Sequence, residues 1–177
     1  MRCSTQTART TLFALVLLAL LVPQPVAWTQ YPAPGPMGGS LGQGLRNAAA
    51  ATQNQVSLLR QAAADWAHRA QYPNYGANDF AFDFQNVQRQ FQALRLEFGQ
   101  LAGIVPMLGR AGANNVAAEL GAGLDIIAEL FGFLANRNAA GTLDQATVSR
   151  TASVLQEAVG AWGQELQKAN SRLGLVW

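Results

Sequence analysis

Residues 80–101 read FAFDFQNVQRQFQALRLEFGQL, and this stretch decides the fold. Its large apolar side chains recur at alternating intervals of four and three residues, the spacing of a heptad seam on an α-helix. Each buried ring or leucine contributes about 1.5–3 kcal/mol, so such a helix needs other elements to cover it. The seam consists of Phe80, Phe84, Val87, Phe91, Leu94, Phe98 and Leu101.

Three other stretches carry seams with the same spacing, and we expect helices over residues 41–71, 116–136 and 142–173 beside the one that ends near residue 104. The seam of residues 41–71 is Leu45, Ala49, Thr52, Val56, Leu59, Ala63, Trp66 and Ala70. The seam of residues 116–136 is Val116, Leu120, Leu124, Ile127, Phe131 and Leu134. The seam of residues 142–173 is Val148, Ala152, Leu155, Val159, Trp162, Leu166, Ala169 and Leu173.

Short connections rich in proline, glycine and asparagine separate these four stretches. Short connections place consecutive helices side by side and antiparallel. The sequence therefore predicts an all-α protein, an up-down-up-down antiparallel four-helix bundle over residues 41–174, with residues 175–177 as an apolar tail.

Polar residues beside the connections predict helix caps. We expect Asn78 or Asp79 to cap the second helix and Asn114 or Asn115 to cap the third. Thr142 opens the fourth helix with Gln145 three residues on, which predicts a capping box.

Residues 1–27 have the pattern of a secretory signal peptide. Arg2 and Arg9 precede an apolar run at residues 11–22, which is shorter than the roughly 20 residues that span a bilayer as a helix. Two prolines follow the run, and Ala27 offers a cleavage site. An uncleaved membrane anchor is the alternative, whereas the absence of a cysteine after the run excludes a lipoprotein. We therefore expect a secreted or periplasmic protein.

The chain expected after cleavage is neutral and contains no cysteine. Loss of Arg2 and Arg9 leaves ten basic and ten acidic residues, and Cys3 is lost with the same segment. A chain without excess positive charge lacks the electrostatic attraction that nucleic-acid binding needs, so we expect no nucleic-acid partner. Residues 28–40 are rich in proline and glycine and predict a flexible lead-in. We expect no membrane span after residue 27.

The sequence offers no recognisable catalytic or cofactor motif. It contains no GxxxxGK[ST] and no GxGxxG, and its one GxSxG match, at residues 38–42, lies in the proline- and glycine-rich segment instead of between a strand and a helix. A covalent haem needs CxxCH, and a haem held by side chains needs an inward histidine. The one histidine, His68, follows the seam residue Trp66 by two positions, which turns it about 200° toward the outside. We therefore predict a protein that is not an enzyme and has no cofactor and no metal.

A few acidic residues at helical spacing leave open a metal-dependent enzyme. Asp65 and His68 are three residues apart on one helix. Two pairs of carboxylates lie four residues apart and could bind a hard cation: Asp79 with Asp83, and Asp125 with Glu129. Solvated side chains are the preferred explanation for Asp65 with His68 and for Asp125 with Glu129. For Asp79 with Asp83 the preferred explanation is the helix dipole, which favours acids in the first turn.

A second apolar row lies beside the seam of residues 116–136 and consists of Ile126, Leu130 and Phe133. Phe82 and Leu96 also lie off their seam. These side chains either widen the core or form a face for a partner, because contiguous exposed apolar patches usually mark contacts. With catalytic motifs absent, they favour a protein that acts through contact with a second copy of itself or with another protein.

A carrier is the alternative function. The small side chains of Ala49, Thr52 and Ala63 are expected to face the phenylalanines of residues 80–101. Such a pairing of small and large residues could leave a cavity for an apolar ligand or a porphyrin in the bundle core.

Overall fold

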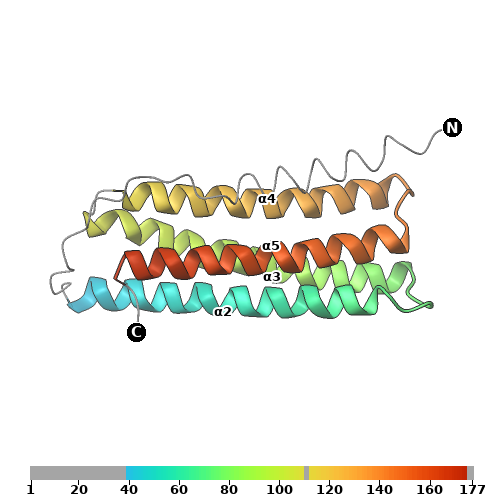
Figure 1. The fold of residues 1–177 in the computed structure, drawn as a ribbon, viewed down its shortest axis with the longest axis horizontal. Helices are drawn as coiled ribbons and strands as arrows, with labels where there is room; N and C mark the ends of the chain where they lie inside the picture. The colour runs from blue at the N-terminus through green and yellow to red at the C-terminus, as the bar shows by residue number, and fades with distance from the viewer. Residues whose placement is uncertain (1–38, 110–111, 175–177) are drawn as a thin grey trace. The chain divides into compact units, whose positions relative to one another are not determined.

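The computed structural model describes residues 39–109 and 112–174, and within them the chain forms four α-helices and one short 3-10 helix. In chain order these are α2 (Gly39–Arg69), α3 (Ala77–Ile104), the 3-10 helix η1 (Val105–Leu108), α4 (Ala113–Ala139) and α5 (Gln145–Arg172). Consecutive helices run in opposite directions (Figure 1). The predicted up-down-up-down four-helix bundle is therefore confirmed.

The predicted seams form the core of the bundle. Every seam residue is buried except Phe84 and Val116, and these two are partly buried and pack against the core. Both tryptophans of the seams are core side chains, with Trp66 fully buried and Trp162 nearly so. The heptad spacing thus identified almost the whole interior of the described chain.

Small residues bring α2 close to both of its neighbours, α3 and α5. On α5, a Cβ added at Gly163 would lie only 2.7 Å from a Cγ atom of Val56 on α2. Large rings instead hold α3 and α4 farther apart, since Phe131 of α4 stacks on Phe91 with ring centres 5.0 Å apart and meets Phe84 edge-on at 6.0 Å. The side-chain sizes on the seams therefore set the distances between the helices.

Trp162 links α5 to both α3 and α4. Its indole Nε1–H donates a hydrogen bond of 2.8 Å to the backbone oxygen of Leu120. Gly123, one turn farther along α4, leaves room for the indole ring, because a Cβ there would lie 2.7 Å from Trp162 Cδ1. The ring of Phe98 on α3 packs edge-on against the same indole at 5.5 Å. One tryptophan thus fixes the register of three helices.

The caps of α3 and α4 differ from the predictions. α3 begins after Gly76, and Asp79 acts from the third helical position, where its carboxylate accepts a hydrogen bond of 2.9 Å from the Gly76 N–H. α4 begins directly after Gly112, whose φ of 83° is accessible to glycine at little cost. The prediction that an asparagine at 114 or 115 caps α4 is therefore wrong, because the helix starts before both.

The predicted capping box of α5 is also wrong. Asp144 is the N-cap, and its Oδ1 accepts a hydrogen bond of 2.6 Å from the Thr147 N–H. Gln145 instead reaches across to the α2–α3 connection, where its Nε2 donates to the backbone oxygens of Ala70 and Tyr72 at 2.9 and 2.7 Å. The start of α5 is thereby fastened to the end of α2.

The predicted signal peptide, the lead-in up to residue 38 and the tail at 175–177 lie outside the described residues. Gly39 and Ser40 of the predicted lead-in belong to α2, which begins two residues earlier than expected. Of the helices that the structure describes, none has the length and apolar character needed to cross a membrane.

Candidate functional site

The three residues predicted as a partner face lie along one side of α4. Ile126, Leu130 and Phe133 follow Gly123 at intervals of three, four and three residues, so they share the side of the helix on which Gly123 meets Trp162 of α5. Leu130 is partly buried and packs against the core, Ile126 is half-buried, and Phe133 is 44% exposed. We name Ile126, Leu130 and Phe133 the α4 row. It runs from the α4–α5 contact outward to solvent.

Opposite charges lie at the two ends of the α4 row. The same spacing continues to Glu119 before Gly123 and to Arg137 after Phe133. The guanidinium carbon of Arg137 lies 5.4 Å from the centre of the Phe133 ring, a cation–π distance. Glu119 is exposed and makes no ion pair with any residue that the structure describes. The row is therefore apolar in the middle, acidic at one end and basic at the other.

Phe82 and Leu96 are both exposed on α3, at 61% and 65%. The interpretation that these two widen the core is therefore wrong. The Arg69 guanidinium lies 5.8 Å from the centre of the Phe82 ring and covers part of it. Neither side chain continues the α4 row, because both belong to α3.

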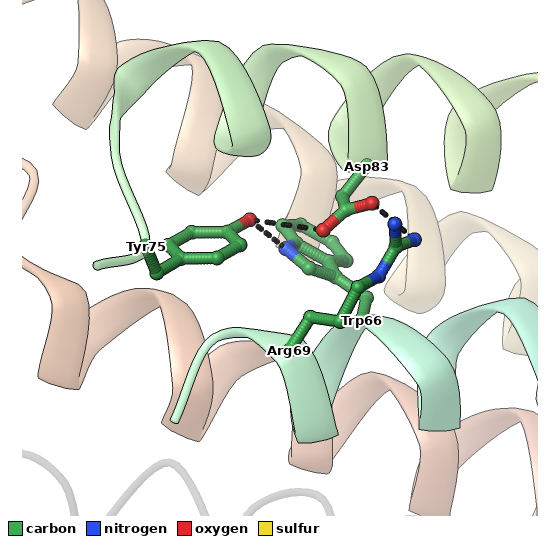
Figure 2. A network of polar contacts seen from close by, with 4 residues as sticks. All are labelled: Trp66, Arg69, Tyr75 and Asp83. Carbon is green, nitrogen blue, oxygen red and sulfur yellow. Dashed lines mark hydrogen bonds and ion pairs between the residues drawn. The ribbon is translucent and has the colours of Figure 1, made fainter. Parts of the chain in front are cut away.

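A buried polar cluster joins α2 to α3 (Figure 2). The Asp83 side chain is only 1% exposed and forms an ion pair with Arg69, which is 44% exposed. The Tyr75 hydroxyl donates to Asp83 Oδ2 at 3.3 Å and accepts a hydrogen bond of 2.7 Å from Trp66 Nε1. The cluster thus ties the last turns of α2, the connection that follows and the second turn of α3.

Burial dominates the electrostatics of this cluster. It raises the pKa of Asp83, and the nearby Arg69 guanidinium and the Tyr75 hydrogen bond lower that pKa by less. Burial likewise raises the pKa of the Tyr75 hydroxyl. Desolvation is costly for a carboxylate unless it is well paired, so the burial of Asp83 costs free energy. Its contacts with Arg69 and Tyr75 connect α3 to the end of α2.

The acidic residues considered as metal ligands differ in burial and in partners. Asp83 is buried, paired with Arg69 and in the second turn of α3, so its assignment to the opening turn, where the helix dipole favours acids, is wrong. Asp125 forms an exposed ion pair of 3.0 Å with Arg95 on α3. Asp65 and His68 are exposed, and the His68 ring packs edge-on against Tyr72. Within residues 39–109 and 112–174, no three His, Cys, Asp or Glu side chains are grouped to hold a metal ion.

One small pocket lies between α3, α4 and α5, near η1. Its volume is about 10 Å³, which is about the space that one water molecule needs. It is too small for a porphyrin. The residues expected to face a cavity, Ala49, Thr52 and Ala63, are all buried and do not line it. Its lining consists of Phe98, Leu101, Ala102, Val105, Val116, Ala117, Leu120, Leu166, Ala169, Asn170 and Leu173.

No protein-family model matches the chain, and neither a curated protein nor a solved structure matches it. Inferences about function therefore start from the geometry of the α4 row and of the polar cluster.

Sequence reasoning missed the burial of Asp83 and the charged ends of the α4 row, although the spacing carried both signals. Asp83 follows Phe80 by three residues and precedes Val87 by four, which places it on the seam side of α3. Glu119 and Arg137 extend the spacing of the α4 row in the same way.

Proposed function

We propose that this chain is an exported, non-catalytic helical bundle that acts through protein–protein contact at the α4 row. The α4 row itself carries the proposal. It places three large apolar side chains on one helix side beyond the buried seam, and its phenylalanine is 44% exposed. Contiguous apolar patches on a protein surface usually mark contacts.

The polar groups of the described chain support a non-catalytic role. Asp83, Arg69 and Tyr75 pair with one another and do not line the pocket near η1. Catalytic acids and bases commonly lie in a cleft that admits a substrate. A buried carboxylate that is closed off by its own partners is better explained as a tie between two helices.

Site-specific photocrosslinking tests the contact surface. A photoreactive phenylalanine analogue at Phe133 or Ile126 is expected to form covalent adducts in the cell that exports the protein. The same analogue at Asn54, exposed on α2, is the matched control and should form few adducts. Equal labelling at all three positions, in variants with unchanged thermal unfolding, would refute a contact at the α4 row.

The sequence pattern of residues 1–27 supports export. Amino-terminal sequencing of the protein recovered outside the cytoplasm is expected to begin at Trp28, directly after Ala27. Recovery of the protein only in membranes, with Met1 or Arg2 at its start, would contradict a cleaved signal peptide and favour the anchor.

A further inference from the structure

We infer that the partner at the α4 row is a second copy of this chain, with the two α4 helices antiparallel across a two-fold axis. The inference rests on the proposed function, since it names the partner of the same surface. It is carried by the order of charged and apolar residues along α4, which is complementary to the same order read backwards.

Residue 128 is the midpoint of the stretch from Glu119 to Arg137. Residues equally far on either side of it have opposite charges at the ends and apolar side chains near the middle. An antiparallel pairing centred there opposes residues whose numbers lie equally far on either side. Glu119 then meets the partner's Arg137, Ile126 meets the partner's Leu130, and Phe133 lies level with the partner's Gly123. Each contact occurs twice, as a two-fold interface requires.

Two of these pairs are physically favourable. Opposite charges meet at both ends, where the exposed Glu119 lacks an ion-pair partner within the described chain. The partly buried Ile126 meets the partner's Leu130, so apolar side chains face each other near the axis. A parallel pairing would instead oppose Glu119 with Glu119 and Arg137 with Arg137, and like charges repel.

The adjoining edge of α5 repeats the same polarity. Gly163 faces α2. Arg150, Val154 and Glu157 lie on roughly the opposite side of α5, and they follow one another at intervals of four and three residues. α5 runs antiparallel to α4, so Arg150 lies toward the Arg137 end and Glu157 toward the Glu119 end. Val154 is half-buried between these two exposed charges and adds apolar area.

The size of the surface indicates a weak dimer. Residues 119 to 137 span about 27 Å of helix, and a strip about 10 Å wide gives roughly 270 Å² per copy. Standard stable interfaces bury about 800 Å² per partner. Even with the α5 edge added, the contact falls short of this, so we expect dissociation in the micromolar range or above.

Charge reversal combined with mixing tests the antiparallel register. Sedimentation equilibrium of the exported wild-type protein is expected to show a monomer–dimer equilibrium. Glu119→Arg alone and Arg137→Glu alone should each weaken self-association at least tenfold, because like charges then meet at both ends. An equimolar mixture of the two variants should recover association, since a mixed dimer has opposite charges at both contacts.

Controls separate association from folding. Circular dichroism checks that each variant keeps its helical content, and Asp65→Arg, exposed on α2, should leave association unchanged. A loss of stability in Arg137→Glu would also reduce association, but mixing with Glu119→Arg would not reverse it. Recovery of association in the mixture therefore reports the pairing of opposite charges.

Three results would overturn the inference. They are a wild type that stays monomeric at the highest concentration, single variants that associate like wild type, and a mixture that stays monomeric. If the wild type stays monomeric while Phe133 still crosslinks to another protein, the second copy is excluded and the proposed contact function stands. Either of the other two results excludes the antiparallel register. If Phe133 forms no adducts above the Asn54 control, both fail.

Discussion

Replacing Arg69 with alanine is expected to destabilise the bundle more than replacing Asp83, although the two form one ion pair. Arg69→Ala leaves the Asp83 carboxylate 99% buried with the Tyr75 hydroxyl, at 3.3 Å, as its remaining partner. Asp83→Asn removes the charge at nearly constant volume, and the amide oxygen can still accept from Tyr75. Arg69 is 44% exposed and can turn to water when its partner is neutral.

The magnitude follows from the burial of the two partners. Breaking a fully buried pair by removing one side costs about 3–5 kcal/mol. Because Arg69 is nearly half exposed, its attraction for Asp83 is screened, and we expect about 1.5–3 kcal/mol for Arg69→Ala. Asp83→Asn should cost less than about 1 kcal/mol, since one modest hydrogen bond is at stake. In the double variant, Arg69→Ala should cost less than about 1 kcal/mol.

The pH dependence has a definite sign. Burial raises the pKa of Asp83 above its ordinary value of 3.8, so the folded chain holds this proton more tightly than the unfolded chain does. The stability contributed by Asp83 therefore falls as pH rises from 3.8 through the raised pKa, and is regained on acidification. Arg69→Ala raises that pKa further, so the deficit of this variant is largest at neutral pH and shrinks as pH approaches 3.8.

Urea unfolding at several pH values measures these differences, with helical content followed by circular dichroism. The free energies of wild type, both single variants and the double variant form a cycle whose coupling isolates the charge pair. Two results would refute the reasoning: Arg69→Ala costing the same with asparagine at position 83, or its deficit persisting undiminished at pH 3.8.

Gly163→Ala should destabilise the bundle, because the new Cβ would lie 2.7 Å from a Cγ of the β-branched Val56 and such overpacking costs about 1–3 kcal/mol. The matched Gly99→Ala, with open space around the glycine, should raise the unfolding free energy by up to about 1 kcal/mol; equal effects in urea unfolding would contradict the close α2–α5 contact. Asp144→Ala should lower the melting temperature at neutral pH. The hydrogen bonds that Asp144 accepts from Thr147 lower its pKa below 3.8, so the difference from wild type should vanish as pH falls through this lowered pKa. Trp162→Phe removes a buried 2.8 Å hydrogen bond and should cost about 1–3 kcal/mol, measured by thermal unfolding; no change would show that the indole N–H is dispensable.

The spacing of large apolar residues was enough to predict the bundle and nearly all of its core. The side chains of a seam such as Phe91, Leu94 and Phe98 lie on one side of their helix. They are buried from water only when that side packs against the seams of other helices. The caps were harder to predict because each connection offers several polar residues. Asp144 and Thr142 both suit an N-cap, and the choice depends on where the chain leaves the preceding turn, which tertiary contacts such as that of Gln145 decide.

The candidate site was predicted in part. The apolar members of the α4 row followed from their spacing, but the exposed fraction of Phe133 depends on how closely α5 approaches α4. That approach is set by Gly123 and Trp162, two residues from different helices whose meeting no local pattern reveals. The pairing of Asp83 with Arg69 likewise depends on the turn between α2 and α3, which brings two distant charges together.

The same packing rule explains why Ala49, Thr52 and Ala63 are buried and do not line the pocket near η1. Small side chains on a helix leave a cavity only if the helices stay at the distance that large side chains need. Here Ala63 and its small neighbours are buried, and α2 lies close to α3 and α5. α4 packs against rings, as Phe131 does on Phe91, and so lies farther from α3. Large apolar side chains that these contacts do not cover remain on α4, and there we propose the contact surface.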